Sequence, residues 1–247
     1  MKNIAIIVAG GQGRRMGQPK QFLKINGKPM LEWTVAAYQA CLLIDGIILV
    51  IAPDQFKAAR KIKAKKIINI VAGGRERQDS VWNGLDLLPE SCEIVAIHDG
   101  ARPAVTKEII DKSIREAKQH GAAIVAVPIK DTIKMTNDED EMKNASHRES
   151  VISSARGGKL KIKNEGVTIK KTVDRKSLWA AQTPQTFRVG IIRQAYVRLK
   201  GKATDDAMAV EKLGLPVRIV VGSYDNIKVT TPADLVMMGA ILKKRRS

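Results

Sequence analysis

Residues 4–20 read IAIIVAGGQGRRMGQPK, and they join an apolar run directly to a glycine-rich, basic segment. The apolar run 4–9 is followed at once by glycines, a pattern typical of a buried parallel strand that ends in a tight loop. Glycine has no Cβ, so the backbone N–H groups of such a loop can approach an anion closely. Arg14, Arg15 and Lys20 add cations beside the loop. The stretch therefore predicts a polyphosphate-binding loop at the carboxyl end of a first strand.

Two familiar phosphate loops do not fit this spacing. The pattern G-x-G-x-x-G, begun at Gly11, would need its third glycine at Met16. The pattern G-x-x-x-x-G-K-[ST] fails because Lys20 follows Pro19 and precedes Gln21. The loop is therefore of another kind, in which arginine and a lysine after proline supply the charge. The alternative interpretation is a strand-to-helix turn whose basic residues are solvated.

The composition is that of a globular α/β protein. With 247 residues and 44% hydrophobic content, the chain can bury a substantial core. The sequence has no apolar run long enough to cross a bilayer, and the N-terminal apolar stretch is too short for a secretion signal. Cys41 and Cys92 are isolated, which indicates free thiols in a reducing compartment. We therefore expect a cytoplasmic protein.

The net charge of +18 favours phosphorylated substrates, nucleic acid or simple solubility. Proteins that bind nucleic acid usually add exposed aromatic side chains to a basic surface. This chain has three Trp, three Tyr and three Phe, and none lies in the basic clusters 57–66 and 243–246. The composition thus disfavours nucleic acid as a partner, and a basic nucleic-acid-binding protein remains the alternative of another class.

Apolar strands alternate with helical segments up to residue 127. The predicted strands after the first are 47–52, 67–71, 94–97 and 122–127, and the predicted helices are 29–42, 55–66, 81–88 and 106–120. This alternation predicts a Rossmann-like, doubly wound and mostly parallel sheet, with its ligand crevice at the carboxyl ends of the strands. Polar loops at 73–80 and 98–103 follow two of these strands. Asp99, just beyond a strand, is suited to hold a divalent ion or a ribose.

The segment 133–172 breaks this alternation. Residues 159–163 and 167–170 alternate polar and apolar side chains about a turn at 164–166, which predicts a β-hairpin. The pattern leaves open whether this insertion is solvated or is an arm that contacts a second subunit. In the last third of the chain we expect a loop at 181–187, helices at 189–199, 204–213 (capped by Thr204) and from 231, and strands at 217–221 and 226–229.

Six segments of the chain resemble the family of 2-C-methyl-D-erythritol 4-phosphate cytidylyltransferases. They are AGGQGRRM (9–16) with PKQ (19–21), ERQDSV (76–81), HDGARP (98–103), DTIK (131–134), TVDR (172–175) with TPQ (183–185), and DNIKVT (225–230). The resemblance implies a single nucleotidyltransferase domain over residues 1–247, with 133–172 as an inserted β-arm that forms a homodimer. It also implies Mg²⁺-dependent transfer of CMP from CTP to the sugar-alcohol phosphate, with release of pyrophosphate.

The resemblance further implies which residues form the site. The catalytic cations would be Arg15, Lys20, Arg175 and Lys228. The CTP-binding positions would be Ala9, Gly10, Gly11, Gly13, Gly74, Ser80, Asp99 and Gly100, with Asp99 also holding the Mg²⁺. The sugar-phosphate positions would be Arg102, Thr132, Arg175, Thr183, Thr204 and Lys228. In the family the position matching Arg175 reaches across a dimer interface, which favours the interpretation of 133–172 as a dimerisation arm.

Several of these residues have a plainer interpretation, and the substrate has an alternative. Asp99 could cap a turn, Thr204 a helix, and Lys228 could be an exposed strand residue. A ribitol 5-phosphate cytidylyltransferase would share the glycine loop and the segment 183–187. The segments TVDR and DNIKV favour methylerythritol phosphate.

Overall fold

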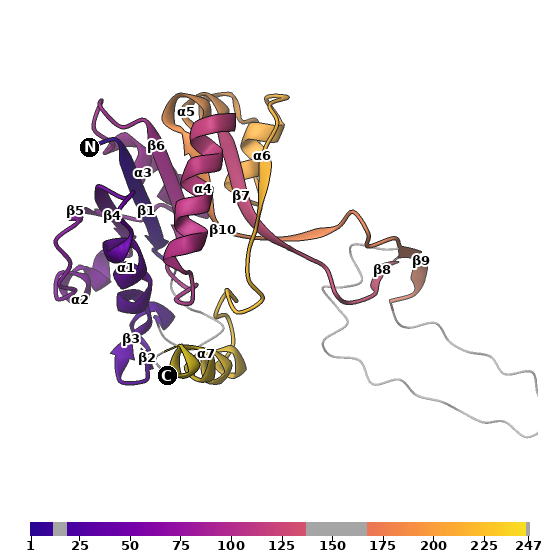
Figure 1. The fold of residues 1–247 in the computed structure, drawn as a ribbon, viewed down its shortest axis with the longest axis horizontal. Helices are drawn as coiled ribbons and strands as arrows, with labels where there is room; N and C mark the ends of the chain where they lie inside the picture. The colour runs from indigo at the N-terminus through magenta and orange to yellow at the C-terminus, as the bar shows by residue number, and fades with distance from the viewer. Residues whose placement is uncertain (12–18, 137–166, 246–247) are drawn as a thin grey trace, which may run out of the picture. The chain divides into compact units, whose positions relative to one another are not determined.

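The apolar run that opens the chain forms strand β1 (Asn3–Ala9) of a seven-stranded sheet. The computed structural model describes residues 1–11, 19–136 and 167–245, and its sheet has the order β11-β7-β10-β6-β1-β4-β5 (Figure 1). Parallel pairing joins β1 to β4 and β6, β4 to β5, and β7 to β11. The bounds are β4 (Gly46–Ile51), β5 (Ile67–Ala72), β6 (Ile94–Asp99), β7 (Ala122–Pro128) and β11 (Arg218–Val221). The predicted mostly parallel α/β fold is confirmed.

Strand β10 (Trp179–Arg188) runs antiparallel to β6 in the middle of this sheet. The loop predicted at 181–187 is wrong, because these residues belong to this strand. Gln185 and Thr186 are buried, and both make hydrogen bonds to side chains outside the strand. Polar residues can occupy a central strand when their buried groups are hydrogen-bonded, as they are here.

Helices cover both faces of the sheet (Figure 1). Along β1, Ala5 and Ile7 pack in one apolar cluster with α1 and α4, whereas Ile4 and Ile6 pack in another with α3, α5 and α6. Both sets are buried because successive side chains of a strand point to opposite faces. The helices are α1 (Met30–Ala40), α3 (Arg77–Asp86), α4 (Lys107–His120), α5 (Val189–Arg198), α6 (Asp206–Glu211) and α7 (Pro232–Lys244). α7 contributes to a third cluster together with Ala101 and Val229.

The short elements include two departures from prediction. The short elements are η2 (Lys20–Phe22), the hairpin of β2 (Lys24–Ile25) and β3 (Lys28–Pro29), η3 (Pro53–Gln55) and α2 (Phe56–Ala59). The helix predicted over 55–66 is wrong beyond α2, because like charges four residues apart, such as Lys57 and Lys61, oppose its extension. Residues 226–229, which were predicted to form a strand, are described by the structure and form none.

Helix caps decide where three of the helices begin. The Thr106 hydroxyl accepts a hydrogen bond from Ile109 N–H at the start of α4, and the Thr231 hydroxyl accepts one from Asp234 N–H at the start of α7. Thr204 does not cap α6. The cap is Asp205, whose carboxylate accepts from Met208 N–H at 2.9 Å, because the helix begins one residue later than predicted.

The described chain separates into two compact units, which we call the main unit (Met1–Val127 and Ala181–Ser247) and the inserted unit (Pro128–Ala180). In the inserted unit, β8 (Ile133–Thr136) pairs antiparallel with β9 (Ile169–Val173). The turn predicted at 164–166 and its first strand lie outside the described residues. The inserted β-arm at 133–172 stays a prediction. Among the described helices, none has the length and apolar character needed to cross a membrane.

Candidate functional site

A pocket of about 770 Å³ opens at the carboxyl ends of β1, β5 and β6, within the main unit. This is where a doubly wound sheet binds its ligands. The predicted site residues that line the pocket are Ala9, Gly10, Gly11, Lys20, Gly74, Ser80, Asp99 and Lys228. Val8, Gln21, Arg75, Glu76, Arg77 and Ala101 complete the described lining.

The two glycine loops meet at the floor of this pocket. A Cβ on Gly73 would lie 3.3 Å from the Gly10 Cα and 3.1 Å from the Ser80 Oγ, so the backbones of the two loops approach each other closely. A Cβ on Gly74 would lie 2.2 Å from the Cβ of Asp79, which requires glycine there. The Ser80 hydroxyl accepts a hydrogen bond from Gly74 N–H at 3.0 Å and holds the second loop at the start of α3. The loops thus leave backbone exposed to a ligand.

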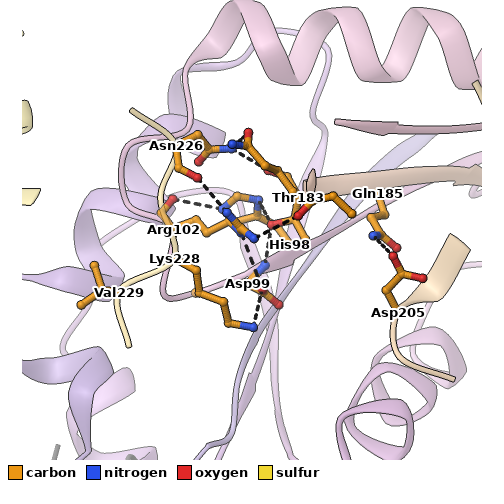
Figure 2. Close-up of polar contacts among 12 residues, drawn as sticks. His98, Asp99, Arg102, Thr183, Gln185, Asp205, Asn226, Lys228 and Val229 are labelled. Atoms are coloured by element: carbon orange, nitrogen blue, oxygen red, sulfur yellow. Dashed lines mark hydrogen bonds and ion pairs between the residues drawn. The ribbon is translucent and has the colours of Figure 1, made fainter. Parts of the chain in front are cut away.

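Asp99 lies at the end of β6, with three cations around it. Its Oδ2 is 2.8 Å from Lys228 Nζ and 3.7 Å from Arg102 Nε (Figure 2). Its Oδ1 is 3.4 Å from Arg77 Nε. Burial alone would raise the pKa of Asp99, but Arg77, Lys228 and Arg102 outweigh burial and hold that pKa well below its ordinary value. Asp99 is therefore an ionised carboxylate at the pocket wall.

The segment 226–229 is fixed to this wall although it forms no strand. Arg102 Nη1 donates to the Asn226 carbonyl at 2.7 Å, and the Asn226 side chain donates to the Thr183 carbonyl at 3.0 Å (Figure 2). Lys20 Nζ donates to the Val229 carbonyl at 2.9 Å, across 209 positions of sequence. The segment is thereby held by the side chains of Lys20 and Arg102 and by a backbone carbonyl of β10, and Lys20 and Lys228 line one pocket.

His98 and Thr183 connect β6 with β10 beneath Asp99. His98 Nε2 is 3.2 Å from the Arg102 carbonyl, which can only accept, so this nitrogen carries the proton. The Thr183 hydroxyl donates to His98 Nδ1 at 2.9 Å and accepts from Asp99 N–H at 3.1 Å. Burial lowers the pKa of His98 to about 3, so the ring is neutral. The Thr183 hydroxyl therefore links the neutral His98 ring to the backbone of Asp99.

The remaining predicted residues are not among the described lining of the pocket. Gly13 and Arg15 lie outside the described residues. Thr132 and Arg175 belong to the inserted unit, where Arg175 donates to the Lys130 carbonyl. Thr204 is exposed before α6, and its hydroxyl donates to Met208 Sδ. The Gly100 N–H donates to the Val8 carbonyl at 2.9 Å. Their substrate contacts stay predictions.

Arg77 is a pocket residue that sequence reasoning missed. It is the first residue of α3 and contacts both Asp99 and Asp206. Arg77 lies within the segment ERQDSV (76–81), which resembles the family, and this arginine beside a glycine loop was the signal available in the sequence.

These features define a class of protein: an α/β nucleotidyltransferase with a glycine-lined, cation-rich pocket at the carboxyl edge of its sheet. The family model described as "IspD: 2-C-methyl-D-erythritol 4-phosphate cytidylyltransferase" matches residues 3–156 and 156–244. The chain belongs to this family.

Proteins with names of this family are similar to the chain over nearly its full length. A protein of Syntrophus aciditrophicus named 2-C-methyl-D-erythritol 4-phosphate cytidylyltransferase is 45% identical, with 98% of this chain and 97% of that protein covered. One of the same name from Alkaliphilus metalliredigens is 42% identical, with 99% and 95% covered. The crystal structure of 4-diphosphocytidyl-2C-methyl-D-erythritol synthase from Anaerococcus prevotii matches with a TM-score of 0.78 at 30% identity, covering 98% of this chain and 96% of that one.

Proposed function

We propose that this protein transfers CMP from CTP to 2-C-methyl-D-erythritol 4-phosphate and releases pyrophosphate. The observation that carries the proposal is the meeting of Lys20, Lys228 and Asp99 in one glycine-lined pocket. These residues come from the first loop, the last third of the chain and the end of β6. Membership of the family supports the choice of substrates.

The proposed chemistry is a displacement at the α-phosphorus of CTP. A phosphate oxygen of the sugar alcohol forms a bond to that phosphorus, and the bond to the β-phosphate oxygen breaks, so pyrophosphate leaves. The attacking phosphate is already ionised, and no general base is needed. Negative charge concentrates on the α-phosphoryl oxygens, and ammonium groups placed beforehand stabilise it. Lys20 and Lys228 are the described side chains suited to this role, and Arg15 remains a predicted third.

A divalent ion fits the donor set of the pocket when phosphates contribute to its coordination. Asp99 supplies one ionised carboxylate, and no cluster of three or more His, Cys, Asp or Glu suited to a metal occurs among the residues the structure describes. Mg²⁺ is commonly held by one or two carboxylates together with substrate phosphates. Bound in this way, the ion would neutralise developing phosphate charge, and Asp99 would hold it.

The substrate assignment is tested by supplying CTP with either of two sugar phosphates. We expect pyrophosphate release with methylerythritol 4-phosphate at a kcat/KM at least about 100-fold above that with ribitol 5-phosphate, since a site built to bind particular hydroxyl groups discriminates strongly. Equal or preferred use of ribitol 5-phosphate would contradict the assignment.

We also propose a homodimer in which Arg175 of one subunit completes the site of the other. Arginine suits the task because its planar fork grips phosphate oxygens bidentately. The variants Lys20→Ala and Arg175→Ala, each nearly inactive alone, are expected to regain up to about one quarter of wild-type turnover when unfolded and refolded together, because mixed dimers then contain one intact site. Absence of any recovery, in a mixture shown to contain mixed dimers, would rule out the shared site.

A further inference from the structure

An arginine–carboxylate pair at the pocket joins α3 to α6. Arg77 Nη1 and Nη2 donate to the two carboxylate oxygens of Asp206 at 2.9 and 2.8 Å, a bidentate geometry that fixes the plane of the guanidinium. Burial alone would lower the pKa of Arg77, but Asp206, and then Asp99, raise it above its ordinary value. Arg77 is therefore a permanent cation in a fixed orientation.

Asp206 is itself held from several sides. Its side chain is fully buried, and its Oδ1 also accepts a hydrogen bond from the Tyr196 hydroxyl at 2.6 Å. Its backbone N–H donates to the Gln185 side chain at 2.9 Å, which ties the start of α6 to β10. Asp206 cannot follow Arg77 if the arginine moves, so it acts as the fixed end of the pair.

The Nε edge of the same guanidinium faces Asp99. Arg77 Nε lies 3.4 Å from Asp99 Oδ1, whereas Lys228 and Arg102 both face Asp99 Oδ2. The two oxygens of Asp99 are thus held by different partners. Because Arg77 cannot rotate without breaking its two bonds to Asp206, it sets the direction of Oδ1.

We propose that Arg77 is a positioning residue that orients the Asp99 carboxylate toward the bound nucleotide and its metal ion, and that Asp206 acts only through Arg77. The inference rests on the proposed function, because it assigns Asp99 to that ligand. Positional shifts of about 1 Å at a reacting centre are costly, so the loss of this pair reduces turnover without removing any group that touches the reacting phosphorus.

The test is a double-mutant cycle with Arg77→Lys and Asp206→Asn. Lysine keeps the positive charge but cannot bond Asp206 bidentately while facing Asp99. We expect each single variant to lower kcat about 10- to 100-fold with KM for CTP changed less than about threefold, and the double variant to be no worse than Arg77→Lys alone. Independent, multiplying losses, or an unchanged kcat, would overturn the proposal. If Asp206→Asn does not fold, Asp206→Glu replaces it in the cycle.

Lys202→Ala is the matched control. Lys202 Nζ pairs with Glu76 at 2.8 Å and so also links the start of α3 to the chain before α6, but it is exposed and outside the pocket lining. We expect its activity to equal that of the wild type, because exposed ion pairs contribute little.

A second readout does not depend on turnover. Binding of Mn²⁺ in the presence of CTP, followed by electron paramagnetic resonance, is expected to weaken at least about fivefold in Arg77→Lys and in Asp206→Asn and to stay unchanged in Lys202→Ala. Unchanged Mn²⁺ binding in the first two variants would contradict the inference. A wild-type protein that binds Mn²⁺ and CTP but transfers no CMP would instead contradict the proposed function.

Discussion

Replacing Lys20 with alanine is expected to lower the turnover of CMP transfer by about 10³-fold or more, while the affinity for CTP falls far less. Lys20 lines the pocket, and its ammonium group is held at the Val229 carbonyl, 2.9 Å away. A cation fixed in this way needs no rearrangement when charge develops on the α-phosphoryl oxygens. Its contribution therefore belongs mainly to the transition state.

Steady-state kinetics and equilibrium binding of CTP separate the two effects. Lys24→Ala is the control, since Lys24 is an exposed lysine four residues away in β2. Equal losses in turnover and in CTP affinity would show that Lys20 stabilises the bound ground state. An unchanged kcat would show that Lys20 takes no part in the chemical step.

Replacing Asp99 with asparagine is expected to abolish most activity and to destabilise the protein. Arg102 is nearly buried, with 12% of its side chain exposed, and it forms an ion pair with Asp99. Removing one partner of a buried ion pair costs about 3 kcal/mol or more, because the remaining charge stays desolvated. The loss of activity, about 10²-fold or more, follows because the carboxylate proposed to hold the metal ion is gone.

Two measurements on Asp99→Asn are needed together: urea unfolding for stability, and turnover at a temperature where the variant is fully folded. Asp86→Asn is the control, since Asp86 is exposed at the end of α3. A folded Asp99→Asn protein with near wild-type turnover would contradict the role given to this carboxylate.

Much of the fold follows from local patterns in the sequence. The apolar runs that form β1, β4, β6 and β7 can be recognised in the sequence because strands buried on both faces consist of apolar residues. The antiparallel strand β10 was missed for the opposite reason. Its buried groups are polar, and only partners distant in sequence, such as Ser113 for Thr186, make that arrangement stable.

The site likewise has one part that local sequence predicts and one part that it does not. The glycine loops and Asp99 were predicted because they directly follow strands, and strands in a parallel sheet end at a common edge. The pair of Arg77 and Asp206 was not predicted. The two residues are 129 positions apart, and no periodic pattern in the sequence relates them. Contacts of this kind depend on how helices are placed over the sheet, which local sequence does not specify.

We infer that the pocket catalyses attack of a sugar-alcohol phosphate on the α-phosphorus of CTP. The most direct test is to identify the products formed from CTP and 2-C-methyl-D-erythritol 4-phosphate by ³¹P NMR and mass spectrometry. We expect one 4-diphosphocytidyl-2-C-methyl-D-erythritol, with its two coupled phosphorus signals, for each pyrophosphate released. Release of CMP or CDP without a cytidylyl-linked product, or no reaction of CTP at all, would contradict it.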